Sequence, residues 1–327
     1  MSDPSHFVAA VESRMEAALS EDAGLDRRSR ILAEASRHLC VGGGAKRFRP
    51  RLVQLLGEAF AVPEAQSLRI AVAAELIHAA SLLHDDVIDA GTERRGRPTA
   101  NVQWGNSVAV LGGDWLLTRA ILEIVPLGAS VLGDAIETIA AMTRAAVREV
   151  EARGRPDLRF EAWRSLAEGK AGELFSWCGR SIATLASDPA SAAALAQVGR
   201  RLGVAFQMAD DLKDVLDPRS GKDRFADLKN RNPSFVLVLA TEDDPALRDR
   251  LAAFWSQPPG EEAGLAALAA DASKPGVLQR AADMLGEEIR QCLGLLSAGP
   301  RPTIAVALER LAGSFASEPL EHLGGVA

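Results

Sequence analysis

Residues 65–89 read AQSLRIAVAAELIHAASLLHDDVID, and this stretch decides the fold. A helix with this sequence is apolar around much of its circumference and not only along one stripe. Such a helix buries its apolar surface only when neighbours pack on several of its sides. The sequence therefore predicts a central helix over residues 65–89, enclosed by other elements.

The rest of the chain also has a helical period. Apolar residues recur at spacings of three and four nearly everywhere, as in Val8, Val11, Met15 and Leu19. Tyrosine is absent and aromatic residues make up 5% of the chain, so residue types typical of strands are scarce. We therefore expect an all-α protein. The expected helices are 5–20, 30–40, 50–61, 65–90, 105–125, 130–153, 160–186, 190–217, 233–241, 246–255, 275–296 and 301–315.

We expect residues 1–327 to form a single domain. A chain of 327 residues is long enough for one large domain or two of ordinary size. The turn Pro258-Pro259-Gly260 is the best candidate for a boundary. The helices predicted on its two sides have the same character, however, which favours one domain.

Composition excludes several classes of protein. The net charge of −7 argues against a nucleic-acid binder that depends on a general basic surface. Cys40, Cys178 and Cys292 are scattered, which indicates neither a disulfide framework nor a structural zinc site. The N-terminus lacks the pattern of a secretory signal, and no apolar run reaches the length of about 18 residues typical of a membrane span. We expect a cytoplasmic protein that has no transmembrane segment and binds no nucleic acid.

A cluster of carboxylates ends the central helix. Asp85 and Asp89 are four residues apart and share a helix face, and Asp86 lies one position round. Like charges at this spacing repel, and the helix dipole makes them less favourable at a C-terminus. Positive groups from elsewhere should therefore offset this cluster.

A second cluster has the same spacing. Asp210, Asp211 and Asp214 lie on another helix of largely apolar sequence. One such cluster alone is more often a solvated surface or a turn, but two copies beside apolar residues favour a site. Carboxylates facing each other across a cavity suit a hard cation of the magnesium type, together with a diphosphate.

Basic residues that could bind a diphosphate are also present. Lys46 and Arg49 lie in one glycine-led, proline-closed turn, and Arg94 and Arg95 lie in another. Arginine offers a planar fork for phosphate oxygens, and lysine offers a compact charge. A solvated loop is the alternative for each turn taken alone.

Two further residues are candidates from their positions. His78 precedes Asp85 by seven residues and so lies on the same helix face, where its imidazole could donate to the same anion. Lys170 is a lone lysine between glycines in Glu-Gly-Lys-Ala-Gly. A buried core histidine and an ordinary surface lysine are the alternatives.

Together these motifs resemble those of the trans-isoprenyl diphosphate synthases, the polyprenyl synthetase family. The likeness runs from about Gly43 to Leu239. Residues 44–50, Gly-Ala-Lys-Arg-Phe-Arg-Pro, are similar to the family's Gly-Gly-Lys-Arg-x-Arg-Pro. Residues 76–89 and 206–214 resemble its first and second aspartate-rich motifs.

The resemblance implies a single large helical bundle around a central cavity, a homodimer, and magnesium as the cofactor. It implies head-to-tail condensation of isopentenyl diphosphate with an allylic prenyl diphosphate. By motif position, Asp85, Asp89 and Asp210 would hold magnesium, supported by Asp86, Asp211 and Asp214. Isopentenyl diphosphate would be held by Lys46, Arg49, His78 and Arg95. The allylic diphosphate would be held by Arg94, Lys170, Gln207 and Lys222. The six aspartates and Lys170 are the catalytic candidates.

Two other functions share some of these features. A class I terpene cyclase also has an aspartate-rich helix, but it would not need the second cluster or the Lys46 and Arg49 pair. A catalytically silent subunit of a heteromeric synthase would be expected to have lost carboxylates, and all six are present. The sequence favours the transferase.

The length of the product can also be predicted. Ala80 and Ser81, one turn before the first cluster, are small. In the family that this chain resembles, bulky aromatic residues at these positions close the pocket and favour short products. We therefore expect a linear trans-polyprenyl diphosphate of twenty carbons or longer.

Overall fold

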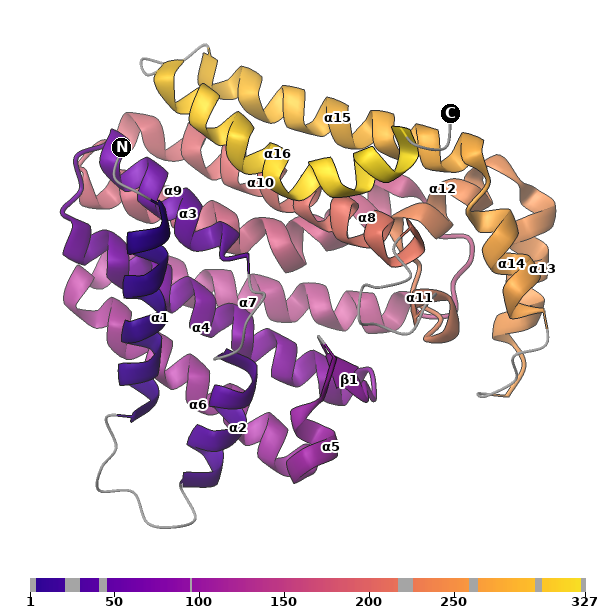
Figure 1. Ribbon diagram of the computed structural model, residues 1–327, viewed down its shortest axis with the longest axis horizontal. Coiled ribbons are helices and arrows are strands. Elements are labelled where there is room, and N and C mark those ends of the chain that lie inside the picture. The colour runs from indigo at the N-terminus through magenta and orange to yellow at the C-terminus, as the bar shows by residue number, and fades with distance from the viewer. Residues whose placement is uncertain are drawn as a thin grey trace.

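The computed structural model describes residues 4–20, 30–40, 46–94, 96–216, 226–258, 264–297 and 302–324, and it is all-α, as predicted (Figure 1). The α-helices are α1 (Pro4–Ser20), α2 (Arg30–Cys40), α3 (Phe48–Ala59), α4 (Glu64–Ile88), α5 (Ala100–Trp104), α6 (Asn106–Ile124), α7 (Ala129–Ala152), α8 (Phe160–Ala167), α9 (Glu173–Leu185), α10 (Pro189–Leu216), α11 (Ala226–Lys229), α12 (Phe235–Asp243), α13 (Pro245–Trp255), α14 (Leu265–Ala272), α15 (Pro275–Ser297) and α16 (Pro302–Gly324). A 3-10 turn, η1 (Val125–Leu127), and a π-helix, η2 (Glu168–Gly172), complete the helical elements. The strands β1 (Glu93–Arg94) and β2 (Arg97–Pro98) form a short antiparallel hairpin.

Most of the predicted helices begin and end within two residues of their expected positions. The helix expected over 160–186 is divided by the π-helix η2, and the short helices α5, α11 and α14 were not among those expected. The last helix continues to Gly324 and not only to residue 315.

Helix α4 is the central helix that the sequence predicts. Its buried residues lie on all sides and include Ile70, Val72, Leu76 and Leu83. Helices α1, α2, α3, α6 and α9 all pack against it. Its C-terminal end reaches the β1–β2 hairpin (Figure 1).

Helices α9 and α10 approach until their backbones touch. A Cβ atom added at Gly199 would lie 2.4 Å from the carbonyl oxygen of Phe175 in α9. One added at Gly203 would lie 2.5 Å from the Cα atom of Gly172, so α10 makes the same kind of contact with η2. Only glycine fits at such contacts, because the obstacle is backbone that cannot rotate away. Since α9 also packs against α4, it links the helices that carry the two aspartate clusters.

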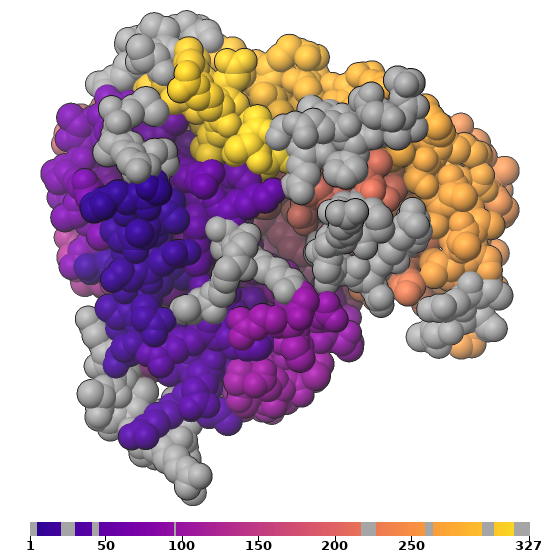
Figure 2. All heavy atoms as spheres, viewed as in Figure 1, coloured from indigo at the N-terminus to yellow at the C-terminus, as the bar shows by residue number. Residues whose placement is uncertain are grey.

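The hydrophobic core extends from Phe7 in α1 to Ala316 in α16 and includes Trp255 and Leu268, which precede and follow Pro258 in the sequence. Figure 2 shows the surface hollowed between the purple N-terminal helices and the orange C-terminal ones. Within the described ranges, no helix combines the length and the apolar character needed to cross a membrane.

The glycine contacts predict a stability effect. Gly203→Ala should lower the free energy of unfolding by about 1 to 3 kcal/mol, because the new methyl group overpacks the contact between α10 and η2. Gly294→Ala is the control, since Gly294 is helical and nothing lies within 4 Å of its added Cβ atom. That change should stabilise the protein by up to about 1 kcal/mol through helix propensity. Urea unfolding of both variants tests this prediction, and a Gly203→Ala protein as stable as the wild type would contradict it.

Candidate active site

The first aspartate cluster lies in the last turn of α4, and its middle member is buried. The Asp86 side chain is 4% exposed. Arg94, on β1, donates from Nε and Nη2 to Asp86 Oδ1 at 3.0 and 2.8 Å. The Gly91 amide donates to the Asp86 carbonyl at 2.9 Å. Asp86 and Arg94, which the motifs assign to catalysis and to the allylic diphosphate, therefore hold the hairpin on the helix.

The two outer aspartates are half-buried, and each has a cation of its own. Lys170 Nζ lies 3.4 Å from Asp85 Oδ2 and donates to Glu149 Oε2 at 2.6 Å. Arg153 donates from Nη2 to Asp89 Oδ1. The positive charge that the sequence requires for this cluster thus comes from Arg94, Lys170 and Arg153.

The pKa shifts follow from these contacts. Burial would lower the pKa of Lys170, but Asp85 and Glu149 outweigh it and the pKa lies above its usual value. Burial raises the pKa of Asp89, although Arg153 opposes this change and Asp85 adds to it. Lys170 therefore remains a cation at neutral pH.

Lys170 lies in the π-helix η2, between α8 and α9. Single π turns are frequent at functional sites, because the extra residue displaces a side chain from the ordinary helical register. Gly169 lies so close to α7 that an added Cβ atom would be 2.6 Å from the Cβ atom of Ala145. The wide turn thus lies directly against the helix that carries Glu149.

The second cluster, near the end of α10, also has a buried middle member. Asp211 Oδ2 accepts the backbone N–H of Phe235 at 2.7 Å, and its Oδ1 accepts Gln207 Nε2–H at 2.8 Å. Burial raises the pKa of Asp211 to about 7, although these two hydrogen bonds act in the opposite direction. Gln207, which the motifs assign to the allylic diphosphate, here contacts Asp211. Asp210 and Asp214 are half-buried.

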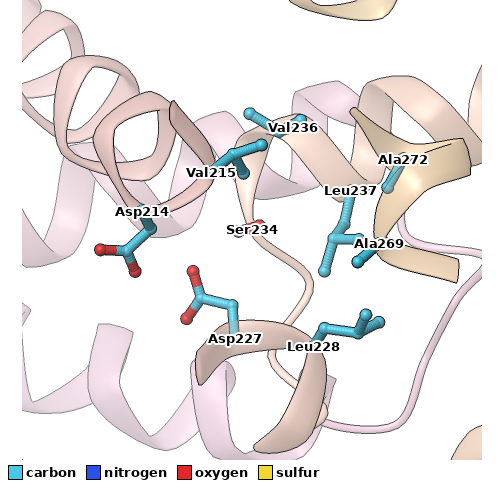
Figure 3. Close-up of a pocket in the computed structure, with 9 residues that line it drawn as sticks. All are labelled: Asp214, Val215, Asp227, Leu228, Ser234, Val236, Leu237, Ala269 and Ala272. Atoms are coloured by element: carbon cyan, nitrogen blue, oxygen red, sulfur yellow. The ribbon is translucent and has the colours of Figure 1, made fainter. Parts of the chain in front are cut away.

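A hollow adjoins the second cluster (Figure 3). It encloses about 330 Å³, including its opening to solvent. The carboxylates of Asp214 and Asp227 point toward one another at one side, and Val215, Leu237 and other apolar residues line the rest. Two consecutive residues of α10, Asp214 and Val215, therefore contribute an acidic and an apolar group to the same hollow.

The two candidates in the first basic turn, Lys46 and Arg49, differ in their exposure to solvent. Lys46 is exposed, whereas Arg49 is 5% exposed and its guanidinium carbon lies 4.7 Å from the ring centre of Phe175. Burial lowers the pKa of Arg49, and its Nε–H has no hydrogen-bond partner within the described part of the chain. A buried cation with an unused donor suits an anionic ligand.

Of the three remaining candidates, the structure describes His78. His78 is half-buried on α4, and its carbonyl accepts the Ser81 hydroxyl at 2.8 Å. Arg95 and Lys222 lie outside the described residues.

A sequence model of the family described as Polyprenyl synthetase matches residues 29–271. The chain belongs to the polyprenyl synthetase family. The chain is 32% identical to the nonaprenyl diphosphate synthase of Mycobacterium tuberculosis over 87% of this chain and 84% of that protein. It is 35% identical to the octaprenyl diphosphate synthase of Escherichia coli over 61% of this chain and 63% of that protein. A crystal structure of a Caulobacter crescentus polyprenyl synthase, complexed with calcium and isoprenyl diphosphate, has a TM-score of 0.85 at 26% identity and covers 96% of this chain and 95% of that chain.

Three contacts of this polyprenyl synthetase could not be found from its motifs. Glu149 and Arg153 lie at the end of α7, far in sequence from Lys170 and Asp89, which they contact. Asn232, which accepts from Arg153, lies in the loop before α12. In the sequence, each of these residues is only a charged or polar residue near the end of a predicted helix. Such residues are common on protein surfaces, so the sequence does not single them out.

The buried Asp211 predicts a stability effect that its neighbours do not share. Asp211→Ala should lower the free energy of unfolding by about 1 to 3 kcal/mol, because the Phe235 N–H at the start of α12 loses its buried acceptor. Asp214→Ala is the matched control, since Asp214 is half-buried, and it should change stability far less. Denaturant unfolding without added metal measures both. Equal losses in the two variants would show that Asp211 does not hold α12.

Proposed function

We propose that this protein is a prenyltransferase that condenses isopentenyl diphosphate head-to-tail with an allylic diphosphate. The product is a linear trans-polyprenyl diphosphate of twenty carbons or longer. The observation that supports the proposal best is that the two aspartate clusters are built in the same way. In each cluster the middle aspartate holds the scaffold, and the outer ones are half-buried carboxylates near the end of a long helix.

The donor set fits magnesium. Asp85, Asp89 and Asp210 are carboxylates, and hard oxygen ligands are what magnesium prefers. When bound, magnesium would supply charge stabilisation to the diphosphate as the allylic C–O bond ionises. Asp86, Asp211 and Asp214 would support the two clusters.

The residues of this chain have separate tasks in the reaction. Lys170, held by Asp85 and Glu149, would present a fixed positive charge to the allylic diphosphate. In their assigned places Arg94 and Lys222 would add positive charge, and Gln207 would add a neutral amide donor. The diphosphate leaves with the electron pair of the C–O bond. The double bond of isopentenyl diphosphate then attacks the allylic carbon, and a new C–C bond forms. The departed diphosphate takes the proton that is lost, so no protein nucleophile is needed.

The second substrate needs a site of its own. Arg49, a buried guanidinium with an unused Nε–H, would bind the diphosphate of isopentenyl diphosphate together with Lys46, His78 and Arg95. The crystal structure of the Caulobacter crescentus relative contains isoprenyl diphosphate and calcium, which supports binding of a divalent metal and a prenyl diphosphate in this fold. We further propose that residues 1–327 form one domain, supported by the continuous core.

One assay tests the proposed function. Purified protein receives magnesium, isopentenyl diphosphate and allylic diphosphates of ten, fifteen or twenty carbons, and the products are sized by chromatography. Elongated products with at least one starter support the function. A folded protein that makes none under these conditions would contradict it.

The metal ligands predict a loss of turnover. Chelation should abolish activity, and Asp85→Ala, Asp89→Ala or Asp210→Ala should each lower turnover by at least about 100-fold, the scale of losing a group that stabilises charge. Binding of isopentenyl diphosphate should suffer less than chemistry. Steady-state kinetics checks this prediction. Near-normal turnover in all three folded variants would exclude the two-cluster metal site.

A second copy of this chain is the proposed partner at an apolar surface on α5, α6, η1 and α7. Apart from Ile88 and Val306, the large apolar side chains exposed in the described structure lie on these elements: Val102, Val110, Leu111, Leu122, Val125, Ile136, Val147 and Val150. Exposed apolar residues that gather on adjacent elements are typical of protein interfaces.

The proposed dimer surface predicts that a single charge introduced into it disrupts the dimer. Leu122→Glu should shift the protein from dimer to monomer, because a carboxylate would be buried without a partner. Val306→Glu, at a similarly exposed position on α16, should leave the dimer intact. Sedimentation velocity measures both variants. A wild type that sediments as a monomer would refute the homodimer.

The face of α4 below the first cluster predicts product length. Ala80 is buried and Ser81 is half-buried. Phe at either position should shorten the product while the first condensation continues, because the ring would fill the path of the growing chain and not the diphosphate sites. Chromatography of the products tests this. A wild type that stops at fifteen carbons, or Phe variants with unchanged products, would show that this face does not line the path.

A further inference from the structure

Arg153, the first residue after α7, contacts two other segments with its guanidinium group. It donates from Nη2 to Asp89 Oδ1 and from Nη1 to the Ile88 carbonyl at 3.2 Å, both at the end of α4. Its Nε donates to Asn232 Oδ1, at 3.1 Å, in the loop between α11 and α12. The side chain is 23% exposed, so the protein shields much of this contact from solvent.

The loop that Arg153 contacts is the one that holds the second cluster. Ser234 donates its N–H to the Asn232 carbonyl at 3.0 Å, and the next residue, Phe235, donates its N–H to Asp211. The loop is also joined to the chain beside Arg153, because the Gly154 N–H donates to the Arg231 carbonyl at 2.8 Å. Hydrogen bonds and the short backbone segment from Asn232 to Phe235 therefore connect Asp89, through Arg153, to Asp211.

We propose that Arg153 is a positioning residue that orients Asp89 and fixes the first aspartate cluster relative to the second. The proposal rests on the proposed function, because the separation of the clusters matters only if one metal-diphosphate group binds between them. Arg153 binds Asp89 through Oδ1 and so fixes the direction of Oδ2. Groups that orient a ligating carboxylate in this way commonly change metal affinity or activity by about 10- to 100-fold when they are lost.

Arginine suits this task better than lysine. The planar guanidinium presents several N–H groups in fixed directions, so that one side chain can contact α4 on one side and Asn232 on the other. An ammonium group is a single point of charge on a flexible stem. Arg153→Lys therefore keeps the charge near Asp89 but loses the connection to the loop.

The first experiment measures metal binding without turnover. Wild type, Arg153→Lys, Asn232→Ala and the control Arg155→Ala are heated with inorganic pyrophosphate and increasing magnesium, and the rise in Tm is followed. Arg155 is exposed and pairs with Asp157, so it is a neighbouring arginine outside the connection. The magnesium concentration for half of the rise should increase by about 10-fold or more in Arg153→Lys. It should increase less in Asn232→Ala and remain unchanged in Arg155→Ala.

The second experiment uses turnover to separate this role from general stability. In Arg153→Lys the magnesium requirement should rise and kcat should fall, whereas the KM for isopentenyl diphosphate should not change. The double variant Arg153→Lys/Asn232→Ala should be no worse than Arg153→Lys alone, because both changes break one connection.

Two outcomes overturn the proposal. One is an Arg153→Lys protein with the magnesium dependence of the wild type in both experiments. The other is a double variant whose loss equals the sum of the two single losses in free energy. A wild type that makes no product refutes the proposed function instead, and the pyrophosphate experiment still decides whether Arg153 positions a metal site.

Discussion

The like charges of Asp85, Asp86 and Asp89 within one turn of α4 are the constraint on which the site depends. They stand at the C-terminal end of a helix, where the dipole already disfavours negative charge. Arg94, Lys170 and Arg153 offset them, and these cations come from β1, η2 and the end of α7. The hairpin, the π-helix and the end of α7 must therefore meet at the end of α4 for the cluster to be tolerated.

The second cluster is stabilised in a different way. Asp211 accepts hydrogen bonds from a backbone amide and a side-chain amide, and neither donor carries a charge. Neutral donors compensate a buried carboxylate less than a cation does, which is why burial still raises the pKa of Asp211 to about 7. The middle aspartate is thus part of the scaffold in both clusters. Asp86 does this through an ion pair with Arg94, and Asp211 does it by accepting the N–H at the start of α12.

The sequence predicts the features that local pattern determines. The 3.6-residue period gives most helix positions, and the apolar circumference of residues 65–89 gives the central place of α4. Pattern does not reveal the π turn at Lys170, because a single wide turn is too short to change the apolar spacing of the helices on its two sides. The sequence pattern also does not predict that Arg49 is buried, since a basic turn is usually solvated. The rings of Phe175 and Phe206, which come from distant parts of the chain, enclose its guanidinium group.

The contacts of Glu149, Arg153 and Asn232 depend on the close packing of helices. Gly199 allows α10 to touch α9, Gly203 allows it to touch η2, and α9 also packs on α4. With larger residues at Gly199 and Gly203, α10 and the loop held by Asp211 would lie farther from α4. An arginine side chain reaches only a few ångströms, so Arg153 can contact Asp89 and Asn232 together only while α4 and this loop lie close to each other. The charges that compensate the first cluster and the loop that holds the second are therefore brought together by residues that carry no charge.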